Sequence, residues 1–238
     1  TETVYGLGAN ALDETAARAI YTAKGRPSDN PLIVHLPDLS QLDLLCRDIP
    51  RQAYDLFAAF SPGPLTVILN KQPQVPDVVS GGLDTVAVRI PSHPVAAALL
   101  REAAVPVAAP SANRSGRPSP TRLAHVLEDL DGRGDLMIDG GDCGVGLEST
   151  VVSLAGELPV LLRPGGISLE MLRSVLGEVR VDDAVSHQLA EGQRPMAPGM
   201  KYRHYAPAAP LTLAQGSPAD IFDNPQSPRL KDFLSKVL

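Results

Sequence analysis

The stretch Thr85-Val-Ala-Val-Arg-Ile90 decides the fold class, because it is a mostly β-branched run bounded by Gly and Pro. The run Leu65-Thr-Val-Ile-Leu69 has the same character, and both predict strands. Further strands are predicted at 31–36, 105–109, 136–138, 150–154 and 159–162. Helical spacing and capping residues predict helices at 13–24, 38–60 (broken at Pro50), 93–103, 119–130 and 168–177. The pattern predicts an α/β (α+β) fold with a mixed sheet, because some adjacent strands have no helix between them.

Composition and charge narrow the class of protein. Of the 238 residues, 44% are hydrophobic and 20% are charged, which is enough apolar material for a packed core. The net charge of −6 argues against binding to the phosphate backbone of nucleic acids. No apolar run approaches the ~18 residues of a membrane span. The two cysteines, Cys46 and Cys143, have no CxxC partner, which excludes a thiolate zinc site and a disulfide scaffold. We therefore expect a cytoplasmic protein.

Periodicity changes along the chain and predicts three regions. Residues 1–182 carry the strands and helices of the main domain. Residues 183–210 are rich in Pro, Gly and polar residues and predict a linker. We expect residues 211–238 to begin a second small α/β domain that is incomplete here. The chain opens at Thr1 in the middle of a motif, so we expect the true N-terminus to lie outside this sequence.

Candidate chemistry is concentrated in polar clusters beside Gly or Pro at the predicted strand ends. The common signatures of P-loop NTPases, α/β-hydrolases and zinc proteases are missing, and the Gly6–Ala11 stretch fits a dinucleotide site only weakly. The clusters are Lys24–Pro31, Ser61–Thr66, Pro110–Gly116, Gly144–Thr150 and Arg163–Gly166. Each has a structural explanation, such as helix-dipole compensation or ordinary turn chemistry. Together they predict a nucleotide-sized crevice that holds anions.

The same clusters resemble a known family, the YrdC-type threonylcarbamoyl-adenylate synthases, over about residues 1–177. The matching motifs are Thr1-Glu-Thr-Val-Tyr-Gly-Leu-Gly8, Lys24-Gly-Arg-Pro27, Asn30-Pro-Leu-Ile-Val-His35, Pro62-Gly-Pro-Leu-Thr66, Pro110-Ser-Ala-Asn113, Glu148-Ser-Thr-Val151 and Leu162-Arg-Pro-Gly165. Residues 198–207 further resemble the linker motif of the long, two-domain form. The resemblance implies a YrdC-like twisted mixed sheet with helices around a large anion-binding crevice.

The resemblance also implies a reaction. L-Threonine, bicarbonate and ATP, with Mg²⁺, would give threonylcarbamoyl-AMP and pyrophosphate. A downstream threonylcarbamoyl transferase would then modify the tRNA adenosine beside the anticodon. We expect no membrane association and no strong direct binding of nucleic acid by this chain.

The match assigns expected roles to individual residues. Lys24 and Arg26 would be the catalytic cations. The threonine and carbamate end would be lined by Thr3, Tyr5, His35 and Thr66. The nucleotide would be contacted by Lys24, Arg26, Asn30, Ser111, Asn113, Ser149, Arg163, His204 and Tyr205. We expect catalysis by positioning and charge stabilisation, with Mg²⁺ on the phosphates and no protein metal ligands.

The sequence departs from the family pattern at Ser61, where a Trp is usual before Pro-Gly-Pro. One alternative is a carbamoyl-transfer enzyme of the related hydrogenase-maturation type, although its acylphosphatase-like and zinc-finger segments are not visible. Another is an RNA-binding or ribosome-assembly module, which the net charge of −6 disfavours. The residues 198–207 combine aromatic and cationic side chains between prolines and predict a lid rather than a passive tether.

Overall fold

A computed structural model describes residues 1–25 and 30–185 of the chain. The chain divides into two compact units, 1–205 and 206–238, and everything described below belongs to the first. The predicted boundaries after residues 182 and 210 stay predictions. Within the described ranges, none of the helices has both the length and the apolar character needed to cross a membrane.

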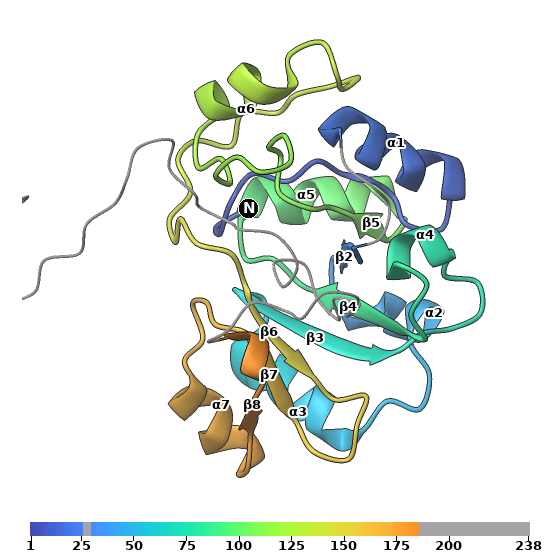
Figure 1. The fold of residues 1–238 in the computed structure, drawn as a ribbon, viewed down its shortest axis with the longest axis vertical. Coiled ribbons are helices and arrows are strands. Elements are labelled where there is room, and N and C mark those ends of the chain that lie inside the picture. Colours follow the sequence, from blue (N-terminus) through green and yellow to red (C-terminus); the bar gives the residue numbers. More distant parts are fainter. Residues whose placement is uncertain (26–29, 186–238) are drawn as a thin grey trace, which may run out of the picture. The chain divides into compact units, whose positions relative to one another are not determined.

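Eight strands of the described residues form one mixed sheet in the order β1-β5-β2-β4-β3-β6-β7-β8 (Figure 1). Their bounds are Ala9–Asn10 (β1), Ile33–His35 (β2), Leu65–Asn70 (β3), Thr85–Arg89 (β4), Val107–Ala108 (β5), Thr150–Ser153 (β6), Val160–Arg163 (β7) and Arg180–Val181 (β8). Strand β3 pairs antiparallel with β4 and parallel with β6, and β2 pairs parallel with β4. The prediction of a mixed sheet in an α/β fold is therefore confirmed.

Seven α-helices accompany the sheet in the described part of the chain. They are Glu14–Lys24 (α1), Leu42–Leu45 (α2), Arg51–Phe60 (α3), Asp77–Ser80 (α4), Pro94–Ala103 (α5), Leu123–Leu130 (α6) and Leu169–Leu176 (α7). Short 3₁₀ turns occur at Leu39–Gln41 and Asp183–Val185. In Figure 1, α3 and α7 lie together near β3, β6 and β7, whereas α6 lies at the opposite end of the view.

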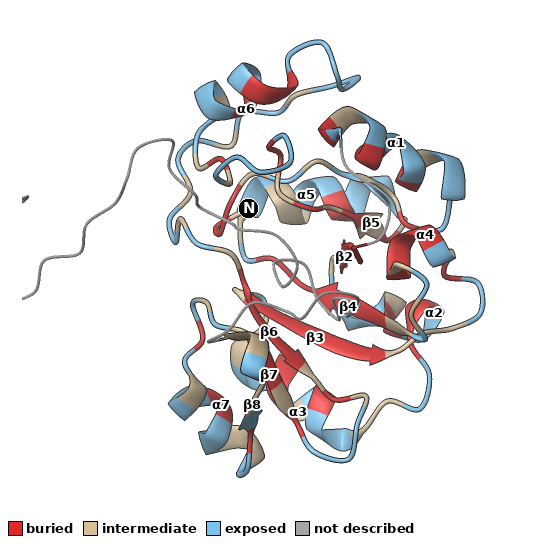
Figure 2. Cartoon of the chain, in the orientation of Figure 1, coloured by how far each residue is buried: buried red, intermediate tan, exposed pale blue. Residues whose placement is uncertain are grey.

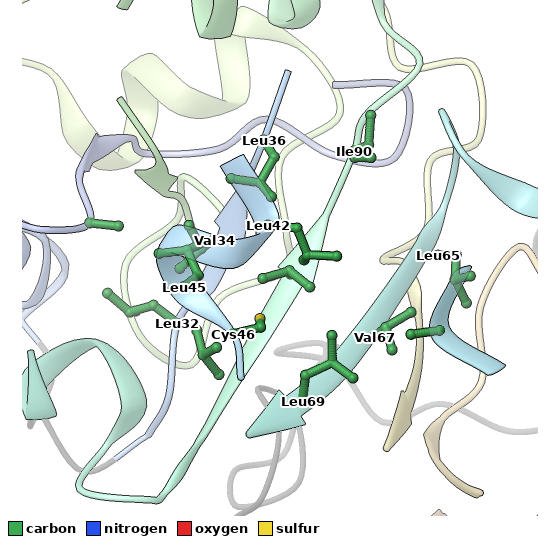
Figure 3. Packing of buried hydrophobic residues seen from close by; sticks show 14 of the residues in the cluster. Leu32, Val34, Leu36, Leu42, Leu45, Cys46, Leu65, Val67, Leu69 and Ile90 are labelled. Atoms are coloured by element: carbon green, nitrogen blue, oxygen red, sulfur yellow. The ribbon is translucent and has the colours of Figure 1, made fainter. Parts of the chain in front are cut away.

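The main hydrophobic core lies on one face of the sheet. Residues opposite one another across the strands form a buried apolar row, which comprises Ala108, Val34, Val88, Val67, Val152 and Leu161. Helices α2, α3 and α7 pack on this face through Leu45, Phe57 and Leu172. Figure 3 shows Leu42 and Leu45 of α2 beside Val34 of β2, with the β3 side chains farther across the sheet. Figure 2 shows β3 and β4 as almost wholly buried. Burial of such side chains stabilises the fold by roughly 1.5–3 kcal/mol each.

The predicted helix signals are confirmed where side chains cap the backbone. The Asp13 carboxylate accepts hydrogen bonds from the backbone N–H groups of Thr15 and Ala16 at the start of α1. Gly25 ends α1 in the left-handed conformation, with φ 63°. The Ser168 hydroxyl accepts from the Met171 N–H at the start of α7. These contacts satisfy amide groups that a helix end leaves without a partner.

Two local predictions are wrong. Residues 136–138 form no strand, because no neighbouring strand pairs with them and Met137 packs on the small cluster around α6 instead. The helix predicted at 119–130 is α6, and it begins at Leu123 and not near Ser119. The Ser119 hydroxyl donates to Glu148, 2.5 Å away, and the Pro120 carbonyl accepts from the Tyr5 N–H. These contacts of Ser119 with Glu148 and of Pro120 with the N-terminal segment replace the expected cap.

Candidate active site

A row of polar side chains crosses the face of the sheet opposite the main core. His35 of β2 lies opposite Arg89 of β4, and Arg89 lies opposite Thr66 of β3. Thr66 lies opposite Val151 of β6. Arg163 of β7 is paired with Val151 at a shift in the β6–β7 register, and its guanidinium donates to the Ser149 hydroxyl, 2.7 Å from the Thr66 hydroxyl. Residues opposite one another on paired strands project to the same face. We call His35, Arg89, Thr66 and Arg163 the polar row.

Arg89, at the centre of this row, is only 4% exposed and is held by three hydrogen bonds. Its Nη1 donates to the Thr3 hydroxyl at 2.7 Å, and its Nη2 donates to Glu2 Oε1 at 2.6 Å. Its Nε donates to the Gly63 carbonyl at 3.2 Å. Burial lowers the pKa of Arg89, and the nearby Glu2 carboxylate acts against that change. Burial acts to raise the pKa of Glu2, but the Arg89 guanidinium holds it below its usual range.

Arg89 and Glu2 were not among the predicted site residues. One signal was present for Arg89, because it is the one charged residue in the otherwise apolar run 86–90. Glu2 lies inside a quoted motif, but nothing local indicates that its partner is 87 residues away. Pairing at that separation depends on the tertiary fold.

His35 is buried and neutral. Its Nδ1 lies 3.2 Å from the Ile33 carbonyl, which can only accept, so Nδ1 carries the hydrogen. Burial, reinforced by the charge of Arg89, lowers the pKa of His35 to about 3. The ring therefore carries no charge at neutral pH, and its Nε2 is a hydrogen-bond acceptor.

Thr66, Ser149 and Arg163 form a second group at the other end of the row. The Thr66 and Ser149 hydroxyl oxygens are 2.7 Å apart. Arg163 donates to the Ser149 carbonyl at 3.0 Å and to its hydroxyl at 3.1 Å. Burial lowers the pKa of Arg163 to about 10, opposed by Glu148 and aided by the like charge of Arg89. Arg163 is therefore still a cation at neutral pH.

Lys24 brings a third set of predicted residues together. It lies in the last turn of α1 and is 3% exposed. Its ammonium group donates to the backbone carbonyls of Ser111 and Asn113, the latter at 2.6 Å. The Ser111 hydroxyl donates to the Asn113 amide oxygen at 2.5 Å. The loop 111–113 and the end of α1 thus form one unit.

Asn30 is fully buried and has an unusual side chain. Neither its amide oxygen nor its amide nitrogen has a hydrogen-bond partner among the described residues. A buried amide without partners costs about 1–3 kcal/mol, and native structures contain few such groups. The predicted nucleotide contacts Arg26, His204 and Tyr205 lie outside the described residues, and their roles stay predictions.

Tyr5 is placed apart from the other residues predicted for the threonine end. Its hydroxyl donates to Asp139 Oδ1 at 3.0 Å and to the Gly141 carbonyl at 2.7 Å. Its side chain packs with the small apolar cluster that includes Ala112 and Val126. The structure therefore brings together Thr3, His35 and Thr66, through Arg89, but directs Tyr5 towards the loop 139–141.

The N-terminal segment connects the polar row to the loop 111–113 that Lys24 contacts, which we call the Lys24 loop. Thr3 contacts Arg89 of the row. Two residues on, the Tyr5 carbonyl accepts from the Ala112 N–H at 2.8 Å, and the Leu7 N–H donates to the Pro110 carbonyl at 2.9 Å. The two groups of predicted site residues are therefore held by one short stretch of backbone.

Two family models match the chain. One is described as "Telomere recombination" (Sua5, YciO and YrdC proteins) and covers residues 1–165. The other is described as "Threonylcarbamoyl-AMP synthase, C-terminal domain" and covers residues 167–232.

Individual relatives are similar over most of the chain. The threonylcarbamoyl-AMP synthase of Bacillus subtilis is 55% identical over 222 residues, which is 93% of this chain and 63% of that protein. The one of Pyrococcus abyssi is 53% identical over 216 residues, 91% of this chain and 63% of that protein. The crystal structure of P. abyssi Sua5 complexed with L-threonine has a TM-score of 0.84 and 55% identity, covering 88% of this chain and 61% of that one. The chain thus spans less than two thirds of the length of these relatives.

Proposed function

Because the chain belongs to the Sua5/YciO/YrdC family, we propose that it is the catalytic part of an L-threonylcarbamoyladenylate synthase. The reaction would join L-threonine, bicarbonate and ATP into threonylcarbamoyl-AMP and pyrophosphate, for threonylcarbamoyl modification of tRNA. Relatives with this name are 55% and 53% identical, and one similar structure was solved with L-threonine. The observation that carries the proposal is the 2.7 Å contact between Thr66 and Ser149, which joins the residues predicted for threonine to those predicted for the nucleotide.

The amino acid would lie along the His35–Arg89 part of the polar row. A guanidinium is suited to a carboxylate, and Arg89 carries N–H groups beyond the three used by Glu2, Thr3 and Gly63. Nε2 of neutral His35 would accept a hydrogen bond from the threonine hydroxyl or ammonium group. This assignment extends the predicted set of Thr3, His35 and Thr66 by one residue, Arg89.

The nucleotide would lie between Arg163 and the Lys24 loop. The side chains of Arg163 and Lys24 are both cations, and cationic side chains in water-poor sites bind phosphate oxygens. Ser149, Ser111 and Asn113 supply hydrogen-bonding groups beside them. The unpartnered amide of buried Asn30 supports a bound molecule nearby, because a ligand would satisfy it.

The chemistry needs no covalent bond to the protein. Threonine and bicarbonate give the carbamate with loss of water, and a carbamate oxygen then attacks the α-phosphorus as the bond to pyrophosphate breaks. His35 is a poor proton acceptor because its pKa is about 3. Arg163 and Lys24 would therefore act by stabilising charge and orienting the reactants.

We propose that Mg²⁺ is held mainly by the phosphates of ATP. The described residues contain no group of three or more His, Cys, Asp or Glu side chains that is arranged to hold a metal ion. That finding is compatible with the predicted arrangement, because Mg²⁺ commonly binds substrate phosphates and keeps several waters.

Pyrophosphate release with each substrate omitted in turn tests the proposal. We expect release only when threonine, bicarbonate and ATP are all present, with AMP recovered in the acylated product. Equal release without threonine, or formation of ADP and phosphate, would overturn it.

A further inference from the structure

The charge of Arg89 is compensated by a carboxylate that has little freedom to move. Glu2 is 9% exposed and contacts Arg89 Nη2 through Oε1. Its other oxygen, Oε2, accepts from the Ser92 N–H at 3.2 Å. Its backbone carbonyl accepts from the Val145 N–H at 2.7 Å. Glu2 is therefore fixed at both its side chain and its backbone.

This compensation matters because the two arginines of the polar row influence each other. The like charge of Arg89 contributes to the lowered pKa of Arg163. Arg89 lies opposite Thr66, whose hydroxyl is 2.7 Å from the Ser149 hydroxyl that Arg163 contacts, so an anion held by Arg163 also experiences the field of Arg89. ATP carries several negative charges, so a bare Arg89 would attract its phosphates into the place meant for the amino acid.

We propose that Glu2 is a specificity-determining residue that reserves the Arg89 end of the site for a singly charged carboxylate and keeps phosphate groups out of it. The inference rests on the proposed function and concerns how its two anionic substrates are kept in separate places. A carboxylate of charge −1 can share the guanidinium with Glu2. The attraction to Arg89 and the repulsion from Glu2 both grow with the charge of the ligand, so the near-neutral pair gives a phosphate little net electrostatic gain. The larger cost of removing a more highly charged phosphate from water is then not offset.

Glu2→Gln tests this directly, because it removes the charge and keeps the size and a hydrogen-bond acceptor. L-Threonine binding is measured by calorimetry with and without inorganic pyrophosphate. In the wild type, pyrophosphate should change the apparent threonine Kd by less than twofold. In Glu2→Gln it should compete with threonine and raise that Kd roughly tenfold, and ATP should inhibit turnover competitively against threonine.

Two further variants complete the experiment. Glu2→Asp keeps the charge but has one methylene fewer. Competition of pyrophosphate with threonine should therefore be stronger in Glu2→Asp than in the wild type and weaker than in Glu2→Gln. Asp77→Asn removes an ion pair with Lys71 outside the polar row, where the Asp77 side chain is 83% exposed. It should behave as the wild type. If Glu2→Gln does not fold, the comparison of the wild type with Glu2→Asp tests whether Glu2 keeps phosphate groups away from Arg89.

The outcomes separate the two proposals. Threonine binding that is equally insensitive to pyrophosphate in the wild type and the Glu2 variants would overturn the role of Glu2, even if binding were weaker in both variants. That result would assign Glu2 to folding alone. A wild-type protein that neither binds threonine nor releases pyrophosphate in a threonine-dependent way would instead count against the proposed function.

Discussion

The ammonium group of Lys24 lies 2.6 Å from the backbone carbonyl oxygen of Asn113, although the two residues are 89 positions apart in the sequence. A lysine in the last turn of a helix ordinarily compensates the helix dipole from the surface. Here it is buried and holds the loop 111–113 against the end of α1. Its structural contribution is therefore larger than its position at a helix end predicts.

Lys24→Ala should lower both activity and stability. Loss of a charge that stabilises phosphates reduces turnover by about 10²–10³. Loss of the buried hydrogen bonds lowers the free energy of unfolding by roughly 1–3 kcal/mol, more than the few tenths to ~1 kcal/mol expected from dipole compensation alone. Pyrophosphate release and urea unfolding measure the two effects. The control is Arg18→Ala on the same helix, whose exposed pair with Glu14 contributes only ~0.3–0.5 kcal/mol. Near-normal turnover of Lys24→Ala would contradict the assignment.

The hydroxyl pair Thr66 and Ser149 should act as one unit in catalysis. Thr66→Val and Ser149→Ala should each reduce kcat/KM by about tenfold, and the double variant should lose less than the product of the two. Thr150→Val is the matched control. Its buried hydroxyl bonds the Ile167 backbone at 2.7 and 2.9 Å, so its loss should affect unfolding only. Strictly multiplicative losses in the double variant would show that the contact is incidental.

Acid should destabilise the protein through His35. Its pKa is about 3 when folded and ~6.5 when unfolded, so below pH 6.5 protons bind the unfolded chain preferentially. The stability contributed by the neutral ring is complete above pH 6.5 and is lost as the pH falls towards 3. By pH 5 the loss from this residue is about 2 kcal/mol. His35→Gln should show a smaller drop in urea midpoint between pH 7 and pH 5. Parallel drops in the two proteins would rule out a buried neutral histidine.

The lid prediction for residues 198–207 concerns a segment outside the described residues and rests on its sequence. His204→Ala with Tyr205→Ala, or truncation before Pro198, should leave a folded domain that turns over slowly or loses its product to hydrolysis. ATP and threonine together should slow proteolysis of this segment in the wild-type protein. Unchanged cleavage with ligands, together with full activity of the truncated domain, would identify a simple linker.

Local chemistry explains which parts of the fold were predictable. Asp13 and Ser168 cap helices through contacts two or three residues away, and the strands at 65–69 and 85–90 follow from their own composition. The run 136–138 is equally apolar, but it meets no partner strand. A strand needs a neighbour, and the sequence of a short apolar run does not say whether one exists.

In the candidate site, too, local motifs predicted some residues and missed one whose role depends on strand pairing. The residues predicted from motifs include Thr3, His35 and Thr66, which the structure collects around one side chain. That side chain, Arg89, was missed because its importance comes from the register of β2, β4 and β3. Register depends on pairing between strands distant in sequence, and neither the spacing of residues in one strand nor its composition determines it.

Because side chains alternate between the two faces of β4, the register of β4 against β3 places the core residues and the candidate-site residues at the same time. Val88 faces the hydrophobic core and its neighbour Arg89 faces the candidate site. If β4 slipped by one residue against β3, a guanidinium would enter the core and a valine would take its place among the polar groups. The energetic penalty for that error is far larger than for a slip in a strand with two similar faces. A molecule with the slipped register therefore has little chance of persisting in a folded form.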